Sequence, residues 1–199
     1  MLQTISKFNT LFLAVLILLS AGTLNNSKVD ARNSQNLTQL PASNIIAAAP
    51  EWKQFLSDEG KFSILMPDEE ILDMTPSKEL ILPGVQTIKL NATMKDNSVF
   101  LAGYADFDIN LNQFPSNEIL DSFLQGMLEG KTNLLSQKNI QLGQYQGKEV
   151  KIQDETKGIT YNSRVFLVGQ RIYILMVGGT RTPQTSDTQK FFNSFQLIQ

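Results

Sequence analysis

The sequence predicts an α+β fold, in which an antiparallel sheet is flanked by helices. Residues 147–179 form three consecutive segments in which apolar residues alternate with polar ones or run unbroken, as they do in β-strands. Only short polar stretches separate these segments, so neighbouring strands are expected to run antiparallel. Between positions 116 and 136 the apolar residues recur instead at helical spacing, which places a long helix beside the sheet.

The three strands of residues 147–179 are expected to form a meander. The first is apolar on one face, and the second carries Arg164 and Phe166 opposite its apolar face. The third, Ile172 to Val177, is apolar on both faces, as is typical of a central strand covered from both sides. Gly169-Gln170 fits a two-residue hairpin turn, because glycine tolerates the positive φ that such turns need. The apolar faces of the first two strands contain Val150, Ile152, Ile159, Tyr161, Val165 and Leu167.

Two pairs of strands are predicted nearer the start of the domain. Apolar residues on both sides of the turn Ser57–Gly60 indicate a hairpin. Residues 86–94 alternate between apolar and polar, residues 95–97 turn the chain, and residues 99–105 return as a more buried strand. The apolar residues of the hairpin are Trp52, Phe55, Phe62, Ile64 and Met66.

The helix predicted at residues 116–136 begins after Pro115, with Ser116 as its cap and Glu118 in its first turn. Its apolar stripe favours packing against the sheet, although a stripe of this kind would equally line a ligand pocket. A strand at Ile140–Leu142 follows. The stripe consists of Ile119, Leu120, Phe123, Leu124, Met127, Leu128, Leu134 and Leu135.

The C-terminal residues predict a short helix and a last strand. Ser186 and Gln189 have the spacing of a capping box, in which each side chain bonds the backbone at the start of a helix. The last strand is expected at Gln196–Ile198. The residues that this helix and its end would bury are Phe191, Phe192 and Phe195.

Residues 1–24 match a secretory signal peptide, with a basic residue, a short apolar run and small residues in that order. Cleavage is expected after Gly22 or after Ala31, and the N-terminal segment engages the membrane during export. The alternative is an uncleaved anchor, although the apolar run is shorter than the ~20 residues that span a bilayer. Residues 25–50 are expected to form a flexible linker, and residues 51–199 a single globular domain.

The composition excludes the catalytic chemistry and metal sites that depend on Cys or His. The 199 residues include neither Cys nor His, which removes thiol nucleophiles, lipid attachment to cysteine, thiolate and imidazole metal ligands, and histidine-based acid–base catalysis. The formal net charge is −2 and basic runs are absent, so no nucleic-acid partner is expected. With 42% hydrophobic residues, the chain has enough apolar material for one core.

Two stretches could hold a cation, but for both we prefer an interpretation without a bound cation. The acidic loop at residues 68–73 has suitable oxygen donors but is typical of a solvated loop. Residues 106–110 imitate the opening of a calcium loop, but Leu111 replaces the required Gly and Asn117 replaces the closing Glu. The acidic residues of the first stretch are Asp68, Glu69, Glu70 and Asp73.

Two pairs of residues could carry catalysis, and neither is convincing. Asp106 and Asp108 alternate along a strand and would point to opposite faces. Ser163 and Lys151 lie on adjacent predicted strands, but nothing marks either as activated. We therefore expect no catalytic, cofactor-binding or metal-binding residue.

Two motifs stand at the ends of the domain. They are Trp52…Phe55-x-Ser57-x-x-Gly60-x-Phe62-Ser63…Met66-Pro67 and Phe191-Phe192-Asn193-Ser194-Phe195. Both resemble motifs of the PsbP-like proteins, in particular a group of small exported proteins of cyanobacteria, and the resemblance spans about residues 51–199. It implies an antiparallel sheet of about six or seven strands between helices, in an α/β/α sandwich.

The resemblance does not fix a function. PsbP itself is an extrinsic, lumenal subunit of photosystem II, but the same fold occurs in a nuclear Ran-binding protein. This chain also departs from PsbP, because acidic residues follow Pro67 where an aromatic residue is often found. It has no His for the metal sites of some members, so no functional residue of the family is carried over.

We expect a non-catalytic, exported accessory protein of the periplasm or thylakoid lumen. It would dock, as a monomer without a cofactor, on another protein or on a membrane complex such as photosystem II. The loops Asp68–Ser77 and Asp154–Gly158 are the expected contact surfaces, because loops held by a rigid sheet often carry binding residues. The alternative is a periplasmic carrier of a small molecule or lipid, with its pocket between the long helix and the sheet; an enzyme is the least favoured function.

Overall fold

The structure is a computed structural model that describes residues 52–77, 84–128, 132–180 and 182–198. The predicted signal peptide and linker, residues 1–50, lie outside these ranges. Within them, no helix has both the length and the apolar character needed to cross a bilayer.

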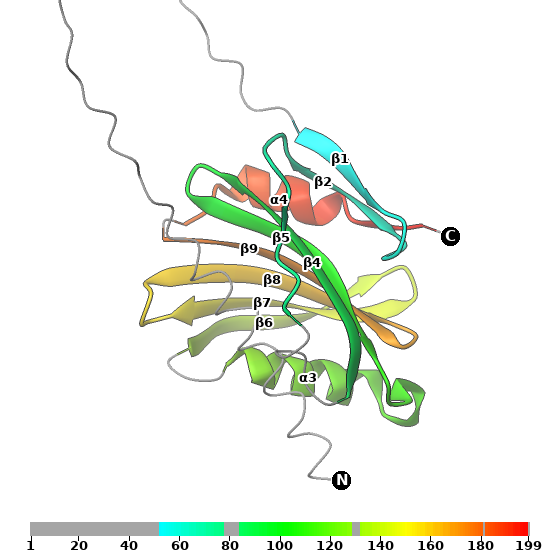
Figure 1. Cartoon of the computed structure of the whole chain (residues 1–199). Helices are drawn as coiled ribbons and strands as arrows, with labels where there is room; N and C mark the ends of the chain where they lie inside the picture. Colours follow the sequence, from blue (N-terminus) through cyan, green and yellow to red (C-terminus); the bar gives the residue numbers. More distant parts are fainter. Residues whose placement is uncertain (1–51, 78–83, 129–131, 181, 199) are drawn as a thin grey trace, which may run out of the picture.

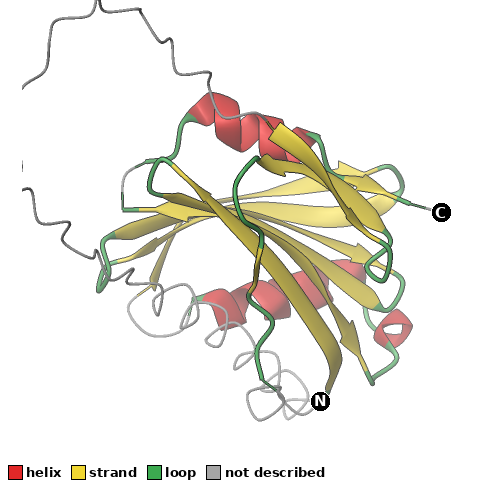
Figure 2. Ribbon diagram, turned by 45° about the horizontal axis from the view of Figure 1, so that its top comes forward, coloured by secondary structure: helices red, strands yellow, loops and turns green. Residues whose placement is uncertain are grey.

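The fold is α+β, as predicted, with a seven-stranded antiparallel sheet at its centre (Figure 1). The strand order is β3-β4-β5-β9-β8-β7-β6, and a small sheet of order β1-β2-β10 lies with helix α4 over one face. Helix α3 lies against the other face, so the two helices are on opposite sides of the sheet (Figure 2). The elements are β1 (Trp52–Ser57), β2 (Phe62–Pro67), β3 (Leu72–Asp73), β4 (Val85–Lys95), β5 (Ser98–Phe107), the 3₁₀ turn η2 (Leu111–Gln113), α3 (Ser116–Met127), β6 (Thr132–Leu142), β7 (Tyr145–Asp154), β8 (Ile159–Val168), β9 (Arg171–Gly179), α4 (Thr185–Asn193) and β10 (Gln196–Leu197).

Each face of the large sheet packs against its own hydrophobic core. Successive residues of a strand point to opposite faces, and β9 is apolar at both sets of positions, so it contributes to both cores. We call these the α3 core and the α4 core. From β9, Ile172, Ile174 and Met176 belong to the α3 core, and Tyr173, Leu175 and Val177 to the α4 core.

The predicted meander is confirmed as β7, β8 and β9, which pair antiparallel in that order. Gly169, in the turn between β8 and β9, has a φ of 62°, the left-handed conformation that favours glycine. The hairpin β1–β2 and the pair β4–β5 are also confirmed. These elements were predictable because their apolar pattern and their turn residues agree.

The helix predicted at residues 116–136 is wrong in its second half. Helix α3 ends at Met127, and residues 132–142 form the edge strand β6, which also extends the strand predicted at Ile140–Leu142. Leu134 and Leu135 are 41% and 50% exposed, at a bulge in the pairing with β7. Ten residues paired with β7 outweigh the helical spacing of two leucines, because spacing is a local signal that strand pairing can override.

Both predicted serine caps are wrong as well. Helix α3 has Pro115 at its N-cap and helix α4 has Gln184, and neither side chain makes a capping hydrogen bond. The backbone carbonyl of Pro115 accepts from the amides of Glu118 and Ile119, and Gln184 accepts in the same way from Thr188. Helix α3 therefore begins one residue earlier than the capping pattern predicted and helix α4 two residues earlier, and each serine lies within the first turn.

Candidate functional site

Several of the residues considered for cation binding are engaged in local contacts. Asp68 forms an ion pair with Lys53, and the side chain and backbone of Thr75 donate hydrogen bonds that lower the pKa of Asp73. Asn110 Oδ1 accepts from the amide of Asn112 and from Gln170 Nε2, so residues 106–110 form a strand end rather than a calcium loop. Among the described residues no three acidic side chains gather in a way that could hold a metal ion.

The two pairs considered for catalysis are not assembled. Asp106 is held by Arg171, in an ion pair described below. Ser163 is fully buried, and its hydroxyl donates to the Leu175 carbonyl at 2.9 Å. Ser163 pairs with Val150, so the neighbouring Lys151 points to the other face of the sheet.

The interface between α3 and the sheet is filled by side chains. Leu120 and Phe123 are 0% exposed and pack with residues of the sheet in the α3 core, so the first half of the predicted stripe is hydrophobic core. Two hollows lined by described residues lie elsewhere. One, of about 420 Å³, lies where the first turn of α3 approaches β6 and β7, and another, of about 200 Å³, lies between the β4–β5 turn and the start of α4.

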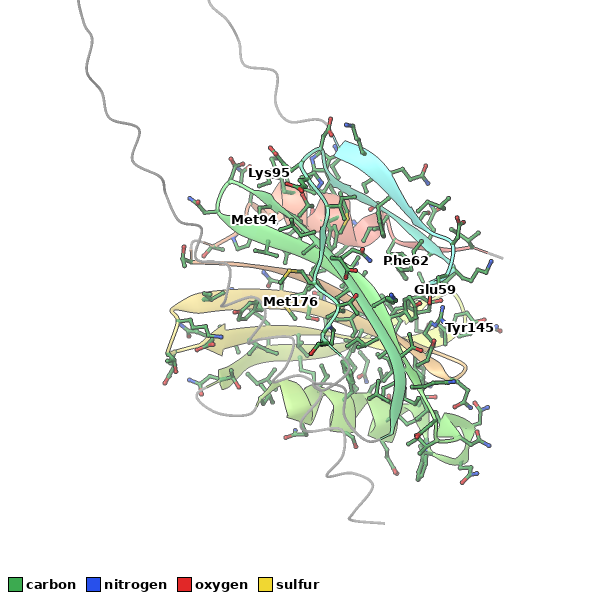
Figure 3. The ribbon with its side chains drawn as sticks, viewed as in Figure 1. Glu59, Phe62, Met94, Lys95, Tyr145 and Met176 are labelled. Carbon is green, nitrogen blue, oxygen red and sulfur yellow. The ribbon has the colours of Figure 1, made fainter. Side chains whose placement is uncertain are left out.

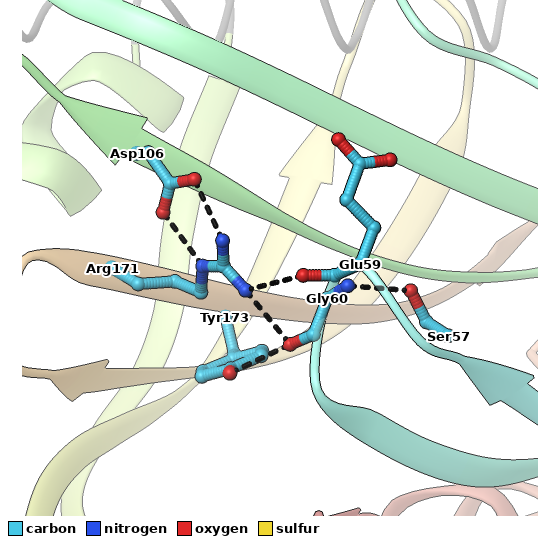
Figure 4. Close-up of polar contacts among 6 residues, drawn as sticks. All are labelled: Ser57, Glu59, Gly60, Asp106, Arg171 and Tyr173. Carbon is cyan, nitrogen blue, oxygen red and sulfur yellow. Dashed lines mark hydrogen bonds and ion pairs between the residues drawn. The ribbon is translucent and has the colours of Figure 1, made fainter.

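A group of polar contacts joins the β1–β2 turn to the large sheet (Figure 4). Arg171, the first residue of β9, forms a two-pronged ion pair with Asp106 of β5, with Nε–Oδ1 and Nη2–Oδ2 distances of 2.6 and 2.7 Å. Its Nη1 donates to the carbonyls of Glu59 and Gly60 at 3.1 and 2.9 Å. The Gly60 carbonyl also accepts from the Tyr173 hydroxyl at 2.8 Å. We call these residues, with Tyr104, the Arg171 cluster.

The Arg171 cluster lies partly over an aromatic ring. The Arg171 guanidinium carbon is 3.9 Å from the centre of the Tyr104 ring, a cation–π arrangement. Glu59 and Tyr145 lie at this end of the molecule, away from Met94 and Lys95 at the β4–β5 turn (Figure 3). Because four of the five N–H donors of Arg171 are used within the protein, the cluster acts as a clamp between the two sheets rather than as an open binding site.

Alkaline pH is expected to lower the free energy of unfolding, because Tyr104 ionises less readily in the folded protein than in the unfolded chain. Burial, with the nearby charge of Glu59, raises the pKa of Tyr104 from 10.0 to about 12. The unfolded chain ionises this tyrosine near its ordinary pKa, so its stabilising effect is complete below that value and is lost as the pH rises towards 12. The loss is about 1.4 kcal/mol per pKa unit. Urea unfolding followed at increasing alkaline pH measures it.

The matched variant for the alkaline experiment is Tyr104→Phe, which keeps the ring and removes the ionising group. It should show a shallower loss of stability over the same pH range, although not a flat one, because burial also raises the pKa of Tyr161 to about 12. Identical pH dependence in the two proteins would show that Tyr104 ionises alike in the folded and unfolded states.

A second polar group lies on the α4 face of β6, β7 and β8. Glu149 of β7 accepts from Lys138 of β6 at 2.7 Å and from Arg164 of β8 at 2.6 Å. Burial alone would raise the pKa of Glu149, but the hydrogen bonds and charges of these two partners outweigh it and lower the pKa. Arg164 continues the group to α4, since its guanidinium lies 4.9 Å from the Phe192 ring centre and donates to Asn193 at 3.1 Å.

Comparisons with known proteins bear on the fold. No model of a known protein family and no curated protein matches the sequence. The solution structure of cyanobacterial PsbP (CyanoP) from Synechocystis sp. PCC 6803 is similar to this structure with a TM-score of 0.51, over 79% of this chain and 99% of that chain. The fold is PsbP-like. The sequences are only 9% identical, so the likeness concerns the fold alone.

A second solved structure is less similar to this one. Protein PA94 of Pseudomonas aeruginosa, whose function is unknown, gives a TM-score of 0.39 at 10% identity, over 69% of this chain and 88% of that chain.

The structure explains one of the two motifs that resemble those of the PsbP-like proteins. In Phe55-x-Ser57-x-x-Gly60-x-Phe62, the Ser57 hydroxyl accepts from the Gly60 amide at 3.0 Å, and the Gly60 carbonyl anchors Arg171 and Tyr173. A Cβ at Gly60 would lie 2.5 Å from Ser57 Oγ and 2.7 Å from the Phe62 ring, so this tight turn requires glycine. The motif is therefore a structural feature of the PsbP-like fold in this chain.

Proposed function

We propose that this protein is a non-catalytic accessory protein that is exported and docks on another protein or on a membrane complex. The observation that carries the proposal is the PsbP-like fold, which spans 99% of the CyanoP structure. PsbP is an extrinsic subunit of photosystem II, and this complex is the first partner to test. The signal-like residues 1–24 supply the export that such a role needs.

The chemistry of the described residues is consistent with docking rather than catalysis. The polar residues with dense contacts clamp strands and turns to one another, as Arg171 and Glu149 do. The segment Asp68–Ser77, predicted as a loop, contains the short edge strand β3. It exposes Ile71 and Leu72 to 42% and 40%, and exposed apolar side chains are suited to contact with a protein. The second expected contact surface, Asp154–Gly158, is a tight turn, because the Asp154 side chain accepts hydrogen bonds from the backbone amides of Thr156 and Lys157 within it.

Membrane washing tests the proposal. Contacts made by the charged residues of these two segments weaken as the ionic strength rises, so membranes of the producing organism should retain the protein at low ionic strength and release it progressively as the salt concentration rises. N-terminal sequencing of the released protein should begin after Gly22 or after Ala31. Intact Met1 in a carbonate-resistant pellet would identify an anchored protein instead. A protein that is wholly free at low salt and co-purifies with a lipid or small molecule would be a carrier.

A further inference from the structure

Strand β6 leaves one edge of the large sheet open. It is the last strand in the order, it pairs with β7 on one side, and no other described strand pairs with its outer side. Residues 133–139 are all exposed. The backbone N–H and C=O groups on the outer side of such a strand are a template for another strand.

The usual protections of an open edge are weak over residues 136–142. The bulge of β6 lies before this stretch, between Leu134 and Ser136, and the pairing with β7 is regular after it. The stretch contains one charged residue, Lys138, and an exposed lysine commonly blocks strand addition. Here Lys138 Nζ lies 2.7 Å from Glu149 Oε1 on β7, so the amine is drawn over the sheet and away from the open edge.

A hollow lies beside the same stretch. It measures about 420 Å³ and is lined by four amide side chains, with Ile140 and Gly147 between them. The amides make no hydrogen bond to another described residue, so their donors and acceptors are free for a ligand. Among the residues that the structure describes, no charged side chain lines the hollow. The four amide residues are Asn117 of α3, Asn139 and Gln141 of β6, and Gln146 of β7.

We propose that residues 136–142 of β6 bind an extended, uncharged segment of a partner protein by strand addition, with one Asn, Gln, Ser or Thr side chain of that segment in the amide hollow. The backbone groups of a strand edge are matched by those of another strand, which makes the occupant a polypeptide. The neutral lining selects against a charged side chain, because a charge without a partner is costly to bury. This inference rests on the proposed docking function and adds the edge of β6 to the loop surfaces that are expected to dock.

A designed peptide provides the probe. It is a fluorescein-labelled ten-residue peptide of alternating threonine and valine with one central asparagine, mixed with the purified protein and followed by fluorescence anisotropy. Binding should slow hydrogen exchange at the β6 amides. Glutamate in place of the asparagine should weaken binding about tenfold or more. Absence of binding, or binding without slower exchange in β6, would overturn the proposal.

Variants of the protein test whether the peptide binds at β6. Gln141→Lys places a charge at the edge and in the hollow, and it should weaken peptide binding about tenfold while leaving the melting temperature within a few degrees. The control is Gln54→Lys, at a glutamine that is also exposed and lies on β1, an edge strand of the small sheet, and it should bind as the unaltered protein does. Equal weakening by both variants would overturn the proposal.

Two further outcomes separate this inference from the proposed function. A dimer in sedimentation whose β6 amides are protected without peptide would identify the occupant as a second copy and overturn the inference. If Gln141→Lys leaves retention on native membranes unchanged, the protein docks through another surface, which overturns the inference and not the proposed function. Free protein at low salt would overturn the proposed function even where the peptide binds β6.

Discussion

Replacement of Ile174 by alanine is expected to lower the free energy of unfolding by about 2–5 kcal/mol, towards the upper end of that range. Ile174 is 0% exposed in the middle of β9, where it pairs with Gly103 of β5 and Val165 of β8. Strands on both sides hold β9 in place, and α3 covers this face, so the cavity left by the lost methyl and methylene groups cannot collapse. Urea unfolding followed by circular dichroism measures the change.

The control for Ile174→Ala is Lys151→Ala on β7. Lys151 lies on the opposite face of the sheet and is half-buried. Its replacement should change the free energy of unfolding by no more than about 0.5 kcal/mol. Equal denaturation midpoints for the two variants would contradict the assignment of β9 as the central strand.

The sequence predicts β9 well because its neighbours in space are its neighbours in the chain. Strand β8 precedes it across a two-residue turn, and Gly169 marks that turn. The unbroken apolar run from Ile172 to Val177 needs cover on both faces, which the α3 and α4 cores provide. Local pattern and tertiary environment agree here, and the strand is correct in type and position.

Strand β6 shows where local pattern fails. Both sides of this strand are exposed, so no apolar alternation marks it, and Leu134 and Leu135 continue the helical spacing of α3 by coincidence. An edge strand is specified by the backbone pairing that β7 offers, and that pairing leaves little trace in the side chains. The polar run from Ser136 to Asn139 was the available sign that the helix had ended.

The candidate sites, like the strands, were predictable from the sequence only in part. The absence of Cys and His is a property of the composition and needs no structure. The Arg171 cluster could not be assembled from the sequence, because Arg171 contacts Asp106 and Gly60, which lie 65 and 111 residues away in the chain. A lone arginine at the start of an apolar strand was the signal, but it names no partner.

Removal of the Arg171 side chain is expected to cost about 2–4 kcal/mol. Arg171→Ala leaves the Asp106 carboxylate without its partner, and it takes a hydrogen-bond donor from the carbonyls of Glu59 and Gly60. It also uncovers the Tyr104 ring. The cost is below that of a fully buried pair because the Arg171 and Asp106 side chains are 21% and 24% exposed, so water partly replaces the lost contacts.

A double-mutant cycle with Asp106→Ala isolates the ion pair from the rest of the clamp. The double variant should be less destabilised than the sum of the single variants, by about 1–3 kcal/mol, because the second replacement removes a charge that the first left unpaired. Lys53→Ala is the control, since Lys53 forms an ion pair with Asp68 from a side chain that is 70% exposed, and exposed pairs contribute about 0–1 kcal/mol.

Trp52, the single tryptophan, lies on β1 and packs edge-on against Phe100 with ring centres 5.4 Å apart, so its fluorescence reports whether the small sheet stays docked. Because Arg171 ties the β1–β2 turn to β5 and β9, Arg171→Ala should shift the tryptophan emission at lower urea concentrations than the far-ultraviolet circular dichroism. Coincident transitions with a cost no larger than that of Lys53→Ala would show that the small sheet is held by the α4 core alone.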